Sequence, residues 1–342
     1  MKRTTTRQDR CFFRKIVHVP SGTELPYAIM RRGTYIEKLD LSGPQLHLVY
    51  RDVRNTLSSL GMKEYDEFSV SMSDDWEGDG TETDGRFTAL KVESSANEIR
   101  VWLMYTPVYE LKRMATQTRV FHNVPAASIL GAVARGLTPG LCTCGVVNDY
   151  HVIAGERPST TLRQLAEEQG ALVWAARGRI SMMRMAELCA AAARRTYQHG
   201  YERDGVIYWH GRTSDQLGSQ DANFRSFTGW DEVKGRIRTS PSIPFFSGLS
   251  GRRMAPSQTS AQTGYTLNAA PVATQRCVSI VVDGDLSVEA GQAFRMKWFT
   301  GDAEDPIDTS LPDRAVAETV AHDYTPGRFF TRIVGTKAAA AI

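Results

Sequence analysis

The hydrophobic pattern of this chain changes its period twice, and this change limits the folds that the chain can adopt. Before about residue 112, apolar and polar residues alternate in short segments, which is typical of strands with one buried face. Between about 113 and 200 the apolar residues recur at helical spacing, and after 201 short alternating segments return. This order predicts an α+β fold rather than a doubly wound parallel sheet.

The first region, 1–112, is predicted to be mainly antiparallel sheet. Its alternating segments are residues 45–50, 68–72, 87–92 and 99–105. One short helix is predicted over residues 51–61, where Val53, Leu57 and Leu60 recur at helical spacing.

The middle region, 113–200, is predicted to carry helices and a hairpin. A helix over 126–137 has an apolar stripe that includes Ile129 and Leu130, and residues 150–153 form a short strand. A second helix follows Pro158, can be capped by Ser159 or Thr160, and ends at Gly170.

Leu162 and Leu165 form the inner face of that second helix. The next residues predict a hairpin, with strands over 172–174 and 180–182 and a turn at Gly178. An Ala-rich helix is predicted over 184–197.

The third region, 201–342, has the pattern of short strands that is typical of a β-barrel or β-sandwich. Its predicted strands cover residues 201–210, 223–234, 277–282, 293–298, 315–324 and 328–334. The last two strands are joined by a turn at Gly327, and a long loop over 239–273 is rich in Ser, Pro, Gly and Thr.

Charge and composition exclude several functional classes. With 41 basic and 38 acidic residues the net charge is +3, which is too balanced for a nucleic-acid groove, although a basic arm precedes the first strand. No apolar run is long enough to span a membrane or to form a secretory signal. Five cysteines without regular spacing favour assembly in a reducing cytoplasm.

Two patterns could suggest a bound metal ion, and neither fits well. Cys142 and Cys144, with His122 and His151 nearby, are spaced more tightly than structural zinc ligands. The acidic run 74–84 resembles a calcium loop only in part, because Arg86 stands where the closing carboxylate belongs. We therefore predict no metal ion and no cofactor.

No catalytic motif is found either. Phosphate-binding loops, nucleophile elbows and zinc-protease helices do not occur. Glu167 and Glu168 are adjacent on a predicted helix, so they diverge and cannot flank one substrate bond. We predict no catalytic residues and therefore not an enzyme.

Several segments, in order, resemble the central hub family of myophage tail baseplates, which includes the late-control protein D group and the hub part of type VI secretion spike proteins. The resemblance covers about residues 100–335 in order and spacing, at low identity. It rests on residues 119–130, 150–170, 171–180, 288–291 and 321–333. The residues predicted to form the structural core and the family motif are Phe121, Ile129, Leu130, Leu162, Leu165, Gly170, Trp174, His322, Tyr324, Gly327 and Phe329.

The resemblance implies two tail-tube-like β-barrel domains, 1–112 with its basic arm and 201–342 with the long loop 239–273. A small α/β insertion, 113–200, lies between them. It implies a homotrimer that joins the sixfold tail tube, or a tube-initiator protein, to a threefold central spike in the virion. Tape-measure and wedge proteins are further expected partners, and the spike is expected to be a separate polypeptide.

Three alternatives remain open. The first is the distal hub of a long non-contractile tail, which reuses the same domains. The second is a tail-associated peptidoglycan hydrolase, for which Cys144 and His151 are the nearest candidates. The third is a carbohydrate-binding module in which Trp76, Trp230 and Trp298 stack on sugars.

Overall fold

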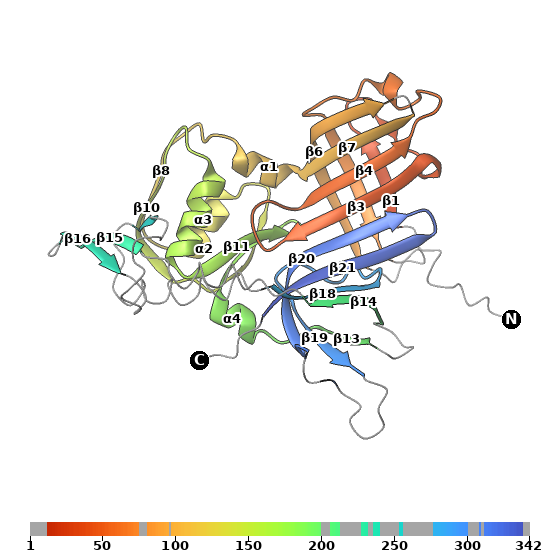
Figure 1. The fold of residues 1–342 in the computed structure, drawn as a ribbon. Helices are drawn as coiled ribbons and strands as arrows, with labels where there is room; N and C mark the ends of the chain where they lie inside the picture. Colours follow the sequence, from red (N-terminus) through yellow and green to blue (C-terminus); the bar gives the residue numbers. More distant parts are fainter. Residues whose placement is uncertain are drawn as a thin grey trace.

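The computed structural model describes residues 12–74, 81–95, 97–199, 206–212, 227–231, 235–239, 253–255, 276–299, 308 and 311–337. Most of this part is β-strand, and its helices gather in the middle of the chain (Figure 1). In this coarse form the predicted α+β pattern is confirmed. The basic arm and most of the predicted loop 239–273 lie outside the described residues.

The first strand set is antiparallel and contains all four strands predicted for it. Along β4 (Gln45–Arg51), Leu46, Leu48 and Tyr50 are buried while the residues between them are half-exposed, as the alternation predicts. The strands are β1 (Phe13–His18), β2 (Thr23–Glu24), β3 (Met30–Lys38), β4 (Gln45–Arg51), β5 (Glu67–Ser73), β6 (Glu82–Ser95) and β7 (Glu98–Tyr105).

The prediction of a helix over residues 51–61 is wrong. Only a 3₁₀ turn, Ser58–Leu60, forms there. The Asp52 carboxylate accepts the backbone N–H groups of Leu57 (3.1 Å) and Ser58 (2.8 Å), so side-chain bonds replace helical ones. Asn55 has φ 54°, which also interrupts a helix.

The middle segment, which we define as residues 106–190, packs two small sheets around helices (Figure 1). One sheet pairs β8 with β10, and the other has the order β11–β12–β9. The elements are α1 (Thr106–Lys112), β8 (Arg119–Pro125), α2 (Ala126–Val133), β9 (Thr138–Cys142), β10 (Val146–Val152), α3 (Pro158–Glu168), β11 (Ala171–Ala176), β12 (Arg179–Arg184) and α4 (Met185–Ala190).

Two predictions for this segment need correction. Helix α3 begins at Pro158, so Ser159 and Thr160 lie in its first turn rather than at its cap. The Ala-rich helix stops at Ala190, and residues 195–199 form a strand that pairs with β19 (Ala293–Trp298), outside the middle segment. The ladder with β19 outweighs the modest helix propensity of that stretch.

The second strand set follows the middle segment. Its long final hairpin, predicted from the sequence, is confirmed, with Gly327 at φ 77° in the turn. The strands are β13 (Arg195–His199), β14 (Ile207–Arg212), β18 (Arg276–Asp283), β19 (Ala293–Trp298), β20 (Arg314–Thr325) and β21 (Arg328–Lys337). A separate small sheet contains β15 (Phe227–Asp231), β16 (Gly235–Thr239) and β17 (Arg253–Ala255).

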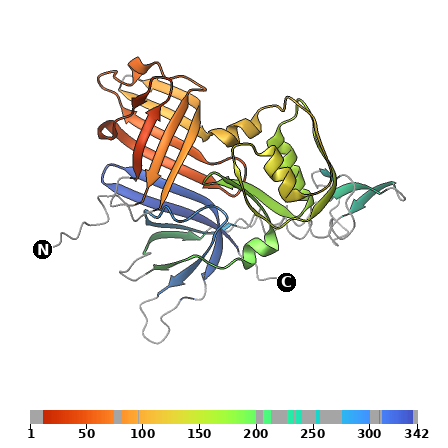
Figure 2. The same cartoon turned by 180° about the vertical axis from the view of Figure 1, so that it is seen from behind.

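The two strand sets form one continuous sheet. Strand β20 pairs with β3 in antiparallel register, with His322 opposite Tyr35, and this pairing joins the sets into a 13-stranded sheet (Figures 1 and 2). Leu286 and Phe329 of the second set are buried in the core of the first. Both the hydrogen bonds and the core therefore hold the two sets in a fixed arrangement.

Candidate functional site at the junction of three parts

Three charged or titratable side chains meet where both strand sets touch the middle segment. Glu37 lies on β3, Arg177 in the turn between β11 and β12, and His322 on β20. Glu37 and His322 are fully buried, and the Arg177 side chain is 8% exposed. Because buried charges are stable only when paired and hydrogen-bonded, this group has to be a complete network.

Arg177 connects all three parts. Its Nε donates to Glu37 Oε1 at 2.7 Å, and its Nη2 donates to the carbonyl oxygens of Leu286 (2.7 Å) and Val288 (3.2 Å). The hairpin turn aims it there, because Arg177 and Gly178 both have positive φ (48° and 72°), as in a two-residue type I′ turn.

Glu37 has further donors. The Tyr35 hydroxyl donates to Oε1 at 2.8 Å and the Ala290 N–H donates to Oε2 at 3.2 Å. Burial, followed by the nearby Glu37 carboxylate, raises the pKa of Tyr35 well above its usual value. Burial alone would lower the pKa of Arg177, but attraction to Glu37 and Tyr35 and the hydrogen bond to Glu37 together outweigh burial, and the net shift is upward.

His322 completes the network as a neutral ring. Burial, and then the positive charge of Arg177, hold its pKa well below the usual value. Its Nε2 lies 3.4 Å from Arg177 Nη2, and its Nδ1 lies 3.0 Å from Thr331 Oγ1. A neutral imidazole in this position accepts at Nε2 and donates from Nδ1.

Apolar contacts surround the network. Trp174 of β11 is 6% exposed and packs in a cluster with Leu39, Ala290 and Val316. A Cβ added at Gly291 would lie 2.6 Å from the Trp174 ring, so only glycine fits there. The hairpin of the middle segment therefore sits directly against the second strand set.

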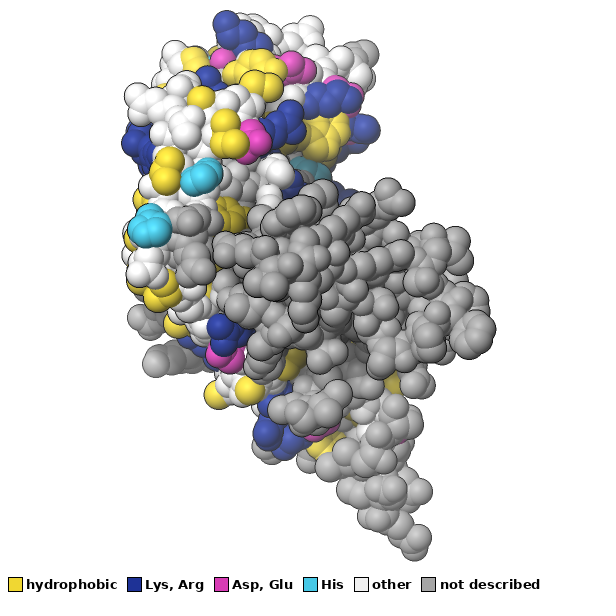
Figure 3. All heavy atoms as spheres, turned by 90° about the vertical axis from the view of Figure 1, so that its left-hand side faces the viewer, with side chains coloured by type: hydrophobic (Ala, Val, Ile, Leu, Met, Phe, Trp, Pro, Cys, Tyr) yellow, Lys and Arg dark blue, Asp and Glu magenta, His cyan; other side chains and the backbone are white. Residues whose placement is uncertain are grey.

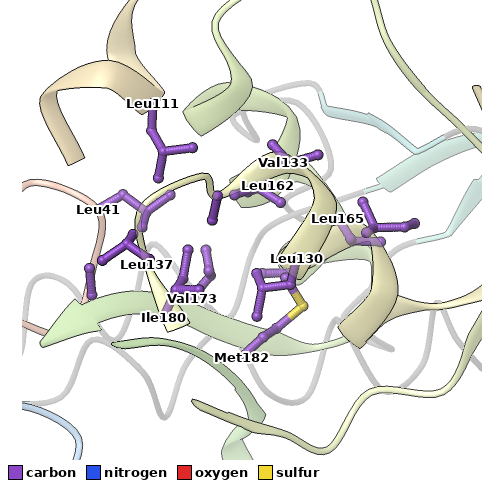
Figure 4. Packing of buried hydrophobic residues seen from close by; sticks show 14 of the residues in the cluster. Leu41, Leu111, Leu130, Val133, Leu137, Leu162, Leu165, Val173, Ile180 and Met182 are labelled. Carbon is purple, nitrogen blue, oxygen red and sulfur yellow. The ribbon is translucent and has the colours of Figure 1, made fainter. Parts of the chain in front are cut away.

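A second contact joins the middle segment to the first strand set. Leu41, from the loop between β3 and β4, is buried in the core of the middle segment. Figure 4 shows it beside Leu111 of α1 and near Leu162 of α3. Together with Arg177, this contact holds the middle segment at two places.

The chemistry of the junction is structural. Its ionised groups face one another in the interior, where a substrate cannot reach them. Such a network fixes the relative positions of three parts of a chain. Because its members are buried, it offers no nucleophile or acid–base pair to solvent.

The motif residues predicted from the sequence fall into three places. In the middle segment, Phe121 is half-buried, Ile129, Leu130, Leu162 and Leu165 are core, and Gly170 has φ 62° just after α3. Trp174 and His322 lie at the junction, and Phe329 lies in the core of the first strand set. Tyr324 is half-buried, and Gly327 is in the final turn.

Glu37 and Arg177 were missed. Glu37 is a charged residue on a strand and Arg177 a turn residue; Arg177 lies 140 residues from Glu37 and 145 residues from His322 in the sequence. The one signal in the sequence is a glutamate within an alternating strand at a position that faces the core.

The residues considered for metal binding or catalysis do not form a site. The hydrogen bond from Cys144 is the main reason that the pKa of Cys142 falls to about 6, and the same bond raises the pKa of Cys144. His122 and His151 lie exposed on β8 and β10. In the described part of the chain, no three His, Cys, Asp or Glu side chains gather as metal ligands do.

The other candidates are placed as follows. Trp298 is 2% exposed and its Nε1 donates to Pro312 O at 2.9 Å, so it belongs to the core. Trp76 and the Trp230 side chain lie outside the described residues, as does most of the acidic loop after Asp74. No helix in the described ranges is long and apolar enough to cross a membrane.

Comparison with known proteins gives similarity in structure alone. No protein-family model matches the sequence, and no curated protein matches it. The 43 kDa tail protein of prophage MuSo2 from Shewanella oneidensis superposes with a TM-score of 0.61 at 12% identity, covering 93% of this chain and 96% of its own.

Two further solved structures are similar. A tail protein from Neisseria meningitidis MC58 gives a TM-score of 0.63 at 9% identity, covering 94% of this chain and 95% of its own. A type VI secretion component from E. coli gives 0.54 at 11% identity, covering 90% and 73%. The resemblance predicted from the sequence is thus confirmed at the level of the fold: this chain has the fold of these phage tail and type VI secretion proteins.

Proposed function

We propose that the chain is a structural protein, the central hub of a phage-type tail baseplate, and that it assembles as a homotrimer. Each strand set would form one tube-like barrel, so three chains would place six barrels around the axis. That ring would join a sixfold tail tube, or its initiator protein, to a threefold central spike. The proposal includes hubs of contractile tails and of long flexible tails.

The observation that best supports the proposal is the antiparallel pairing of β3 with β20, which we call the seam. A ring of six barrels from three chains needs two barrels rigidly linked within each chain. Here the two strand sets share one sheet, and Arg32 Nε and Nη2 each donate to the Asp323 carboxylate across the seam at 2.8 Å. The two sets therefore behave as one body, as this role requires.

We assign three domains within this hub: 1–112 with its basic arm, 113–200 as the insertion, and 201–342 with the long loop 239–273. The arm and the loop are proposed to contact neighbouring subunits or the spike, because their composition suits ordering on binding. Tape-measure and wedge proteins are further proposed neighbours. The assembled hub would lie in the virion baseplate, after assembly in the host cytoplasm.

The surface of the middle segment supports contact with partners. Several of its large apolar side chains are exposed, and contact with a partner would cover them. Figure 3 shows hydrophobic and Lys or Arg side chains interspersed on the side of the molecule that it views. The exposed apolar residues are Met114, Val120, Leu141, Val146 and Ile153.

We also propose that the chain is not an enzyme, since its buried titratable residues are closed to substrates. The competing function is peptidoglycan hydrolysis through Cys144 and His151. A zymogram on cell-wall substrate separates the two. Clearing by the purified protein that Cys144→Ala abolishes would overturn the structural proposal.

The oligomeric state tests the hub directly. Size-exclusion chromatography with light scattering should give a trimer, alone or with the spike protein of the same tail. Electron-microscope images of that trimer should show a ring of six lobes. A chain that stays monomeric with the spike present would contradict the proposal.

A further inference from the structure

A small cavity lies where the loop between β3 and β4 meets the end of α1 and the start of α3. Its volume is about 190 Å³. It lies next to the core leucines Leu41, Leu111 and Leu162, which Figure 4 labels. Leu41 itself lines the cavity, and so do the residues that directly follow the other two leucines. The lining residues are Asp40, Leu41, Ser42, Lys112, Arg157, Ser159 and Arg163. None of them belongs to the Arg177 network.

The cavity carries excess positive charge. Lys112, Arg157 and Arg163 line it against a single carboxylate, Asp40, whose Oδ1 accepts the N–H of Ser42 at 2.7 Å and its hydroxyl at 2.5 Å. Among the described side chains, none of the three cations forms an ion pair. Burial lowers the pKa of Lys112; attraction to Asp40 opposes this shift, and repulsion from Arg163, Lys38 and Arg157 adds to it.

A serine hydroxyl also lines the cavity. Ser159 is 2% exposed and lines the cavity, so a hydroxyl that can donate or accept a hydrogen bond lies beside the three cations.

The helix adds to this attraction. Helix α3 has 11 residues and begins at Pro158, so the N–H of Ser159 is the first that the helix presents at its N-terminus. The positive end of the helix dipole and a free N–H both favour an anion at this place.

We propose that this cavity binds a single tetrahedral oxyanion, either free phosphate or a phosphoryl group. Arg157 can donate paired N–H groups to its oxygens, and Arg163, whose Nε donates to the Ser159 carbonyl oxygen at 3.3 Å, can donate from its Nη groups. Lys112 supplies a third charge, and the Ser159 hydroxyl can donate or accept beside them. The volume suits one such ion with a few waters and is below the range of pockets for larger organic ligands. The bound ion would connect the β3–β4 loop to α1 and α3, and so strengthen the contact between the first strand set and the middle segment.

The test measures binding to the full-length protein. Titration calorimetry and thermal melting would use inorganic phosphate, with sodium chloride at equal ionic strength as the reference. The expected result is saturable binding of phosphate and a rise in melting temperature above that in chloride. Arg157→Gln combined with Arg163→Gln should weaken binding by at least about tenfold, since bonds to charged groups are lost. Ser159→Ala should weaken it less.

The matched control replaces two exposed arginines elsewhere in the middle segment, Arg113→Gln with Arg135→Gln, and should leave binding unchanged. Circular dichroism checks that each variant is folded, and Arg157→Lys keeps the charge if the double variant fails to fold. Methyl phosphate binding as well as phosphate would identify a phosphoryl group as the natural ligand, whereas binding of phosphate alone would identify the free ion. Acetate binding equally well, the absence of saturation, or equal binding by the double variant and the wild type would overturn the proposal.

Discussion

At the scale of single residues, the stability of this molecule depends on whether its buried charges remain paired. The Arg177–Glu37 pair lies in the interior, where Nε and Nη2 of Arg177 and both carboxylate oxygens of Glu37 are hydrogen-bonded. Exposed pairs such as Arg179 with Glu289, two residues further along the same hairpin, are screened by water. Removing one member of the buried pair leaves an uncompensated charge inside the protein, which costs far more than the pair itself contributes.

The first prediction concerns that pair. Arg177→Ala should lower the free energy of unfolding by about 3–5 kcal/mol, since Glu37 stays buried without a counter-charge. Urea denaturation measures the change. Arg179→Ala is the matched control on the same hairpin and should cost at most about 1 kcal/mol. Adding Glu37→Gln to Arg177→Ala should recover part of the loss, and equal losses at the two arginines would refute the role given to the buried pair.

The second prediction concerns pH. The folded-state pKa of His322 is depressed, whereas the unfolded-state value is about 6.5. The stability due to its neutral form is therefore fully present above about pH 6.5 and declines as the pH falls toward the folded-state pKa, by up to about 1.4 kcal/mol per pH unit. Urea denaturation at several pH values should show this decline reduced in His322→Gln and unchanged in the exposed control His151→Gln. Parallel profiles for wild type and His322→Gln would exclude His322 as the cause.

At the scale of helices and strands, the sequence predicts most elements, because each is defined by a local period. The alternation of β4 and the apolar stripe of α3 are local patterns, and both elements form where predicted. The helix over 51–61 fails because the Asp52 side chain takes over the backbone hydrogen bonds, and β13 is missed because its partner β19 lies about 100 residues away. The same limit hides Arg177 and Glu37, whose importance comes from contacts across the chain.

The third prediction concerns the contact between the β11–β12 hairpin and the second strand set. Gly291 has φ 87°, and a Cβ there would meet the Trp174 ring at 2.6 Å. Gly291→Ala should therefore lose about 1–2 kcal/mol from backbone strain and a further 1–3 kcal/mol from overpacking. Gly155→Ala is the control: it has nearly the same φ, 89°, and open space around it, so it should show the strain alone.

Thermal and urea unfolding of both variants measure the difference between them. Combining Gly291→Ala with Trp174→Leu should be less costly than the sum of the two single changes, since a smaller side chain makes room. Equal destabilisation of the two glycine variants, or strict additivity in the double variant, would show that the ring and the glycine do not touch.

At the scale of the whole molecule, the order of strands in the sheet and the order of domains in the sequence differ. Sequence patterns divide the chain into three regions, yet β20 pairs with β3, and Leu286 and Phe329 fill the core of the first strand set. No local period could predict this, since β3 and β20 lie almost 300 residues apart. Because each strand set is completed by residues of the other, the two should not unfold independently.

The last prediction follows from that sharing of a core. Hydrogen exchange at rising urea should remove the protection of β5 and β18, one strand from each set, at the same urea concentration. Phe329→Ala should shift both together by about 3–5 kcal/mol, because its ring stacks on Phe12 with centroids 4.6 Å apart inside the first core. Phe330→Ala, on the opposite face of the same strand and half-exposed, should cost less. If β18 instead lost protection while β5 kept it, the strand sets would be separate folding units, and the rigid pairing that the hub proposal requires would fail with them.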